Sequence, residues 1–262
     1  MKTLINTLLL LFSINSFSQT EMYEVEFVKY FDIDENKFYE SNINNPDREV
    51  VERNKRNFTE EMSYILICDE NESVFNYIAK LDNSQTESSV FESNGNTVTF
   101  SNNSGLVLYR NLINKIYMIP NGKKIMIQDS LYHFDWNTDY SEEKEVLGYR
   151  LKKATAKGLE EDTEITAWYA PDIKMPQGPY LYWGLPGLIL EIDIDVNSEI
   201  GLAYFINSYH FKAGKITKLD PDKKLIPNFD KKKILTPEEL KKQKELQSQK
   251  EKDYLGGGVD KD

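Results

Sequence analysis

The sequence predicts a mainly all-β protein: a curved antiparallel sheet, arranged as a bowl-like or half-barrel meander, with a charged C-terminal helix. Three observations support this fold class. About a dozen short runs alternate apolar and polar residues, the period-two pattern of half-buried strands. Turn residues separate these runs, most clearly Asn121-Gly122 between "KIYMI" and "KKIMI", which predicts a hairpin. The last thirty or so residues, rich in Lys and Glu, lose the alternation.

The expected strands follow one another closely, since short turns mean that neighbours in sequence pair in space. The only cysteine, Cys68, shares a strand face with Leu66 and Tyr64, so we expect a core residue rather than a nucleophile. The predicted strand segments are "MYEVEFVKYF", "SYILIC", "SVFNYIA", "NTVTFS", "LVLYRNL", "KIYMI", "KKIMIQD", "YHFDW", "LGYRLKKATA", "EITAWYA", "LILEIDID" and "AYFINSYHF".

Residues 1–18 are expected to be a signal peptide. Lys2 supplies the positive start, an apolar run follows, and Ser16 and Ser18 suit a peptidase that cuts before Gln19. The apolar run is shorter than the roughly 20 residues of a membrane-spanning helix, and no later stretch is long enough. We therefore expect an exported protein, first in the periplasm, with outer-membrane association or an extracellular location as alternatives.

We divide the mature chain into one β-rich domain, residues 19–230, and a charged tail, residues 231–262. Two segments stand outside the sheet. A polar stretch over residues 36–61 predicts a helix near Asp47 to Asn57 or an excursion over the sheet. In the tail, Thr236 as N-cap and Pro237 at the first helical position predict a solvated helix with a loose end, or alternatively a partner-binding tail.

The string "GLPGLILEID", residues 184–193, predicts a structural turn that leads into a long core strand. Pro186 and Gly187 suit a type II turn, in which proline presets φ and Gly187 takes a positive φ; Gly184 adds a second permissive joint. After the turn, four aliphatic residues fall on one face. Glu191, Asp193 and Asp195 fall on the other, which we expect to be exposed.

The surrounding segment, "EITAWYAPDIKMPQGPYLYWGLPGLILEI", together with the upstream "GYRLKKATA", resembles the GLPGLI family of exported bacterial proteins. Two positions depart from that pattern: Leu151 stands where members often have cysteine, and Lys174 where they often have proline. The resemblance implies an all-β exported protein of Gram-negative bacteria, acting near outer-membrane uptake systems. It also implies a concave sheet, because a related module resembles the bowl-shaped, non-catalytic N-terminal domain of a bacterial peptide N-glycosidase.

Charge and motif content exclude several function classes. A net charge of −11 disfavours nucleic-acid binding. The two histidines, His133 and His210, show no metal-ligand spacing, and a flat row of acids cannot converge on calcium, so no metal or cofactor is expected. The stretch from Asp32 to Asn36 is expected to be a polar turn. Asp129-Ser130-Leu131 matches a short O-glycosylation signal that is weak at three residues.

Aromatic residues just before the turn are the candidate ligand or partner surface, with packing in the core as the alternative. They are Trp168, Tyr169, Tyr180, Tyr182 and Trp183. The expected function is a non-enzymatic binding or accessory protein of the cell envelope, holding a peptide, a lipid or an envelope protein. One alternative is a periplasmic hydrolase whose active site cannot be recognised from the order of residues in the sequence. The other is a structural subunit of an envelope complex. A histidine within reach of a carboxylate inside a cleft would favour the enzyme.

Overall fold

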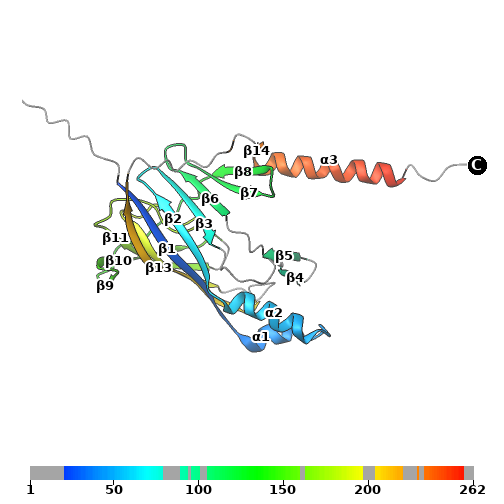
Figure 1. Ribbon diagram of the computed structural model, residues 1–262, viewed down its shortest axis with the longest axis horizontal. Coiled ribbons are helices and arrows are strands. Elements are labelled where there is room, and N and C mark those ends of the chain that lie inside the picture. The colour runs from blue at the N-terminus through cyan, green and yellow to red at the C-terminus, as the bar shows by residue number, and fades with distance from the viewer. Residues whose placement is uncertain are drawn as a thin grey trace, which may run out of the picture.

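The computed structural model describes residues 21–78, 89–93, 96–100, 105–159, 163–196, 204–220, 229 and 233–256. The predicted signal peptide and the last six residues of the tail lie outside this part of the chain. The predicted fold class is confirmed: one open, curved sheet of twelve strands dominates the molecule, beside a separate two-stranded hairpin and a C-terminal helix (Figure 1).

Two meanders side by side form the large sheet, whose strand order is β14-β8-β7-β6-β3-β2-β1-β13-β12-β11-β10-β9. The first comprises β1 (Met22–Ile33), β2 (Met62–Cys68), β3 (Glu72–Ile78), β6 (Gly105–Asn111), β7 (Ile116–Asn121) and β8 (Ile125–Ser130). The second comprises β9 (Glu143–Val146), β10 (Tyr149–Lys157), β11 (Thr163–Ala170), β12 (Leu188–Val196) and β13 (Ile206–Leu219). The separate hairpin is β4 (Ser89–Ser93) with β5 (Asn96–Phe100).

The long strands β1 and β13 join the two meanders. They pair antiparallel along almost their whole length, with Tyr30 opposite His210 and a bulge between Glu26 and Phe27. One pairing departs from the predicted antiparallel pattern, because the short strand β14 (Lys233–Leu235) runs parallel to β8 at the edge. β14 comes after β13 in the sequence but lies at the far edge of the sheet. The alternation of apolar residues does not reveal such a long-range pairing.

Two helices follow β1 and cover one end of the sheet (Figure 1). In α1 (Glu35–Ser41), the side chain of Asp34 accepts hydrogen bonds from the backbone N–H groups of Asn36 and Lys37, so the expected polar turn at residues 32–36 is in fact a helix cap. Asp47 caps α2 (Arg48–Thr59) in the same way, which confirms the predicted helix. Phe38, Val51, Phe58 and Phe205 form the core beneath these helices.

The predicted hairpin at Asn121-Gly122 is confirmed between β7 and β8, with Gly122 at a φ of +67°. The predicted strand "YHFDW" is wrong. Residues 132–136 form an extended loop in which Phe134 packs against both Trp136 and Tyr182. Apolar residues alternate there because one side of the loop packs on the core. The loop does not form the hydrogen-bond ladder of a strand.

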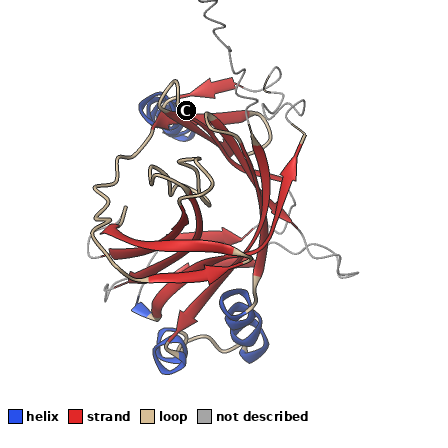
Figure 2. Ribbon diagram, turned by 90° about the vertical axis from the view of Figure 1, so that its left-hand side faces the viewer, coloured by secondary structure: helices blue, strands red, loops and turns tan. Residues whose placement is uncertain are grey.

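The main core lies on the inner face of the curved sheet, and part of it comes from a loop. Residues 171–187, here called the inner loop, connect β11 to β12. Figure 2 shows the sheet curving around loop segments of this kind. The inner loop contributes Ile173, Met175, Tyr182 and Leu185 to the main core, all of them buried. The concave side of the sheet is therefore filled in part by the segment that the sequence singled out.

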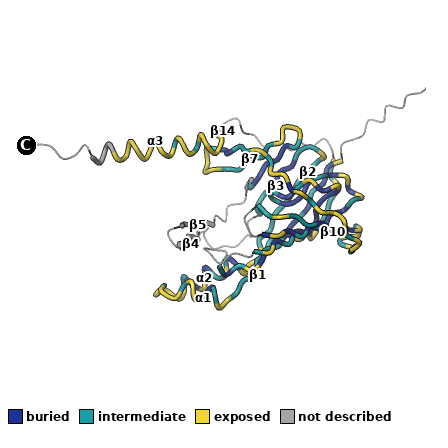
Figure 3. Tube along the Cα trace, turned by 180° about the vertical axis from the view of Figure 1, so that it is seen from behind, coloured by how far each residue is buried: buried dark blue, intermediate teal, exposed yellow. Residues whose placement is uncertain are grey.

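The C-terminal helix α3 (Pro237–Gly256) confirms the predicted charged helix. Thr236 Oγ1 accepts from the backbone N–H of Glu239 at 3.2 Å, and Glu239 Oε2 accepts from the N–H of Thr236 at 2.8 Å, which makes a reciprocal cap. Its described side chains are almost all exposed, and the helix projects away from the sheet (Figures 1 and 3). No helix in the described part of the chain is long and apolar enough to cross a membrane.

Candidate functional site

A buried arginine anchors the inner loop. Arg110 on β6 is fully buried, and its guanidinium donates to the backbone carbonyls of Gly178, Tyr180 and Tyr182, at 3.4 Å for Gly178 and 3.2 Å for Tyr182. It also donates to Gln177 Oε1 at 3.1 Å. Burial lowers the pKa of Arg110 to about 9, so the guanidinium is still charged at neutral pH. The charged guanidinium donates to several oxygens of the inner loop at once, and these hydrogen bonds fix the orientation of the loop.

Gln177 is a second anchor of the inner loop. Its side chain is fully buried, accepts from Arg110, and donates through Nε2 to the carbonyl of Asp69 at 3.3 Å. Its backbone carbonyl accepts from Ile189 at 2.9 Å. Loops of this length would otherwise leave polar backbone groups unpaired inside the protein. Neither anchor was predicted, because a single Arg or Gln in a strand or loop carries no pattern.

The turn at Pro186 is tighter than predicted. Gly187 donates to the carbonyl of Leu185 at 2.8 Å, which closes a three-residue turn centred on Pro186 instead of a type II turn. Gly187 does not have a positive φ; Gly184 does, at +96°. A Cβ on Gly187 would lie 2.3 Å from the carbonyl oxygen of Ala170, so close contact with β11 is what requires glycine there.

The five aromatic candidates are divided between the core and its margin. Tyr169 and Tyr182 are buried, and the hydroxyl of Tyr182 lies 2.9 Å from that of Tyr209, so neither presents a ligand surface. Trp168, Tyr180 and Trp183 are half-buried and pack against the main core. The core interpretation therefore fits two of the five, and the remaining three border it.

A hollow opens beside the turn, between residues 133–138 and the stretch from Gly184 to Pro186. Its volume is about 540 Å³. Two indole hydrogen bonds hold the walls: Trp136 Nε1 donates to the carbonyl of Trp183, and Trp183 Nε1 donates to the carbonyl of Tyr132, both at 2.8 Å. The hollow was missed because its outer wall was taken for a strand.

His133 lies at the mouth of this hollow. Its Nε2 is 3.4 Å from Asp135 Oδ1, and the two side chains are 84% and 98% exposed. Because both side chains are exposed, the pair offers hydrogen-bonding groups at the mouth of the hollow.

The second histidine belongs to a hydrogen-bonded chain on the other face of the sheet. His210 Nδ1 lies 2.5 Å from Asp193 Oδ1, and His210 Nε2 lies 2.9 Å from Ser208 Oγ. Neighbouring residues of these strands, Phe211 and Ile192, belong to the main core, so this chain lies on the opposite face. Tyr30 stacks on the imidazole at a centroid distance of 4.6 Å. The connectivity is that of a Ser–His–carboxylate relay.

The row of acids on β12 is not a uniformly exposed face. Glu191 is buried and pairs with Lys144 at 2.5 Å, Asp193 joins the His210 chain, and only Asp195 is exposed. Among the described residues, no three His, Cys, Asp or Glu side chains gather closely enough to hold a metal ion. Cys68 is confirmed as a core residue; burial raises the pKa of its thiol to about 12.

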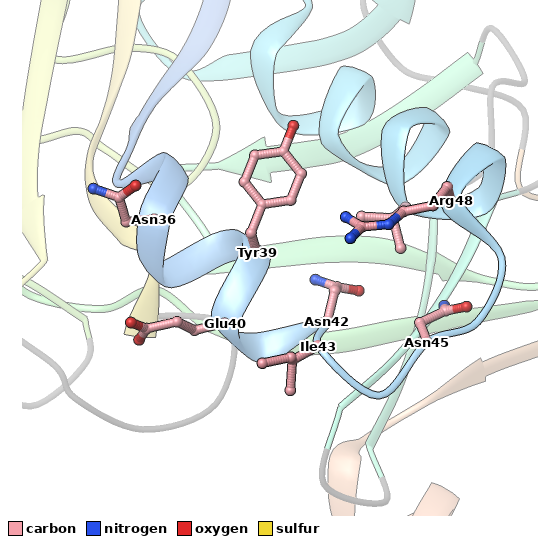
Figure 4. Close-up of a pocket in the computed structure, with 8 residues that line it drawn as sticks. Asn36, Tyr39, Glu40, Asn42, Ile43, Asn45 and Arg48 are labelled. Carbon is pink, nitrogen blue, oxygen red and sulfur yellow. The ribbon is translucent and has the colours of Figure 1, made fainter.

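A second hollow of about 540 Å³ lies between α1 and α2 (Figure 4). Its lining is mainly polar, and several lining groups are already paired: the hydroxyl of Tyr39 donates to Glu52 at 2.9 Å, and Glu40 accepts from Tyr204 at 2.9 Å. Ile43, at the end of α1, is 78% exposed.

Comparison with known proteins finds a family that matches part of the chain. A family described as "Protein of unknown function (Porph_ging)" matches residues 128–191, less than half of the chain, under a different description from the GLPGLI family. The matched segment contains the inner loop and both walls of the hollow beside the turn. No curated protein matches the chain.

Two solved structures of PNGF-II are similar to the chain. The structure in the C2 space group has a TM-score of 0.48 and 15% identity over 86% of this chain. The structure in the P21 space group has a TM-score of 0.47 and 17% identity over 85% of this chain. This chain spans 32% of the length of each.

Proposed function

We propose that this is an exported, non-enzymatic binding or accessory protein of the cell envelope, with the hollow beside the Pro186 turn as its ligand site. The observation that carries the proposal is the hollow itself. Its volume lies within the roughly 300–1,000 Å³ of small-molecule sites, and the Trp136–Trp183–Tyr132 hydrogen bonds connect the segments on its two sides before any ligand arrives. A preformed site loses little entropy on binding.

The lining suits a ligand with both apolar and hydrogen-bonding groups. Trp136 and Pro186 offer apolar surface, whereas His133 and Asp135 offer a donor and acceptors at the mouth. A peptide or a lipid with a polar head has this mixture of groups. The periplasm is the proposed location, following from the predicted signal peptide, and a role near outer-membrane uptake follows from the GLPGLI resemblance.

The proposal is tested by filling the hollow. Thr138 lines it and is exposed, so Thr138→Trp should block the site without disturbing the core. Thr59→Trp, on another exposed threonine at the end of α2, is the matched control. We expect native mass spectrometry of the protein purified from its own cell envelope to show a bound mass in the wild type and in Thr59→Trp, but not in Thr138→Trp. Equal occupancy of all three would refute the site.

A second candidate function, ester or amide hydrolysis, is favoured by the Ser208–His210–Asp193 chain. In that reaction Ser208 Oγ would attack a carbonyl carbon while His210 Nε2 takes the hydroxyl proton and then passes it to the leaving group; water would release the acyl group. The backbone N–H groups beside this chain serve the sheet ladder, so the described residues supply no evident oxyanion site. This makes binding the first candidate.

Labelling separates the two candidates. A hydrolase should react with a fluorophosphonate probe at Ser208, and Ser208→Ala should abolish that labelling while leaving the thermal midpoint unchanged. The binding proposal expects no labelling of Ser208 above that of an exposed control serine such as Ser130.

A further inference from the structure

Lys29 occupies an unusual position for a lysine. It lies on β1 directly opposite Phe211 of β13 and Met62 of β2, on the sheet face that carries the main core. Its Nζ lies 4.5 Å from the ring centroid of Phe31, 5.1 Å from that of Tyr209 and 5.5 Å from that of Phe211. Three rings therefore surround a half-buried amine.

The rings do not satisfy this ammonium group. Aromatic faces attract a cation, but they do not replace the hydrogen-bond acceptors that its three N–H groups lose on leaving water. Within the described part of the chain, Lys29 has neither a carboxylate within 4 Å nor a hydrogen-bond partner. Burial lowers the pKa of Lys29 to about 8, which keeps most of the amine charged at pH 7.

Three other half-buried lysines of this protein are each paired with a carboxylate. Lys55 pairs with Glu35 at 2.7 Å, and Lys144 pairs with Glu191 at 2.5 Å. Lys153 pairs with Glu142 at 3.1 Å. Lys29 lies among three aromatic rings, with no such carboxylate among the described residues, and an unpaired charge in apolar surroundings is costly.

We propose that Lys29 and its three rings form an anion site on the inner face of the sheet, which binds the carboxylate of a small organic acid with an aromatic or aliphatic body. The ammonium would receive the carboxylate. The body would lie along Phe31 and Tyr209, the two neighbouring rings that are only half-buried; Phe211 belongs to the buried core. This site is separate from the hollow beside Pro186 and does not depend on a ligand there.

The test uses phenylacetate, with phenylacetamide as a neutral ligand of the same shape. We expect titration calorimetry to show that phenylacetate binds the wild-type protein at least tenfold more tightly than phenylacetamide. Lys29→Met, which keeps the length of the side chain, should lose this preference. Lys123→Met, on an exposed lysine in the β7–β8 turn, should keep it. Thr138→Trp should also keep it, which separates this site from the hollow.

A second measurement protects the test against a variant that fails to fold. In the wild type, acetylation of Lys29 by an N-hydroxysuccinimide ester, followed by peptide mass spectrometry, should be slowed by phenylacetate and unchanged by phenylacetamide. Equal binding of the two ligands would overturn the proposal. So would a Lys29 that resists acetylation without any ligand, because an amine that is closed off or paired internally cannot receive a carboxylate.

Discussion

Arg110 on β6 and Tyr182 in the inner loop are 72 positions apart in the sequence, and the guanidinium of the first donates to the backbone carbonyl of the second at 3.2 Å. This bond ties the first meander to the loop that leads into the last long strands. The same guanidinium also donates to the carbonyls of Gly178 and Tyr180. One side chain therefore binds three carbonyls of the loop, at every second residue.

Replacing Arg110 should therefore destabilise the whole fold. Arg110→Met removes the guanidinium hydrogen bonds to three loop carbonyls, and each lost bond to a buried group costs roughly 1–3 kcal/mol, so we expect a loss of more than about 3 kcal/mol. Urea unfolding measures this free energy. Arg150→Met, which removes an exposed arginine 3.9 Å from Glu143, is the control and should change stability by less than about 0.5 kcal/mol. Similar effects of the two substitutions would contradict the anchoring role.

Gly187 offers a test of why the turn needs glycine. Gly187→Ala should lower stability strongly, since its Cβ would enter the carbonyl of Ala170. Gly187→Asn should be equally damaging, whereas a turn that required only a positive φ would tolerate Asn. Gly214→Ala, where the nearest atom to the added Cβ is 4.0 Å away, is the control. Thermal unfolding of the three variants decides between the explanations.

Cys68 should be chemically silent in the folded protein. Its thiol is fully buried, and its pKa of about 12 leaves almost no thiolate at pH 8. Ellman's reagent should give no reaction under native conditions and one thiol per chain in concentrated guanidinium. Rapid reaction at native pH would show that the sheet opens at β2.

The pH dependence of stability should carry the signature of Lys29. The folded protein lowers the pKa of Lys29 from its ordinary value of 10.5 to about 8, so between these values the unfolded chain binds more protons. This group therefore adds stability as the pH rises from 8 to 10.5, and its penalty is complete below 8. Lys29→Met removes the penalty, so the variant should have the higher thermal midpoint at pH 7.

The difference between Lys29→Met and the wild type should shrink as the pH approaches 10. Other titratable groups, including the hydroxyl of Tyr209 beside Lys29, are present in both proteins, so their contributions cancel in the comparison. Thermal scans at pH 7, 8, 9 and 10, with Lys123→Met as control, measure the effect. A difference that stays constant with pH would mean that Lys29 is not desolvated.

Thr236 should control the start of α3 without affecting the sheet. Thr236→Ala removes one half of the reciprocal cap with Glu239, which typically costs about 0.5–2 kcal/mol of helix stability. Because α3 is largely exposed, we expect faster amide exchange in its first turns and an unchanged thermal midpoint. A lower midpoint for the whole protein would show that α3 supports the sheet.

Local patterns in the sequence predicted most of the sheet. Alternation identified β1, β2 and β12, and the Asn121-Gly122 pair identified one hairpin, because these signals depend on residues close in the chain. Pairing of β1 with β13 and the parallel edge strand β14 could not be predicted, since they join segments far apart. The loop at residues 132–136 was wrongly predicted as a strand, because its packing on one side gives the same alternation of apolar residues as a strand.

Candidate site residues were harder to predict for the same reason. The sequence drew attention to the aromatic cluster before the turn, yet Tyr169 and Tyr182 are buried. Lys29 lies in the predicted strand "MYEVEFVKYF", and nothing in the sequence singled it out. Its significance depends on rings from β1 and β13, which only the pairing of those strands brings around it.

The central claim, that the hollow beside Pro186 binds a ligand, is tested most directly by the indole N–H signals of the three tryptophans in a ¹H–¹⁵N spectrum. Trp136 and Trp183 hold the walls of the hollow, whereas Trp168 lies elsewhere, with Lys144 4.2 Å above its ring. On addition of a small-molecule extract of the cell envelope, we predict that the signals of Trp136 and Trp183 move and that of Trp168 does not. Three unmoved signals, or movement of Trp168 alone, would contradict the claim.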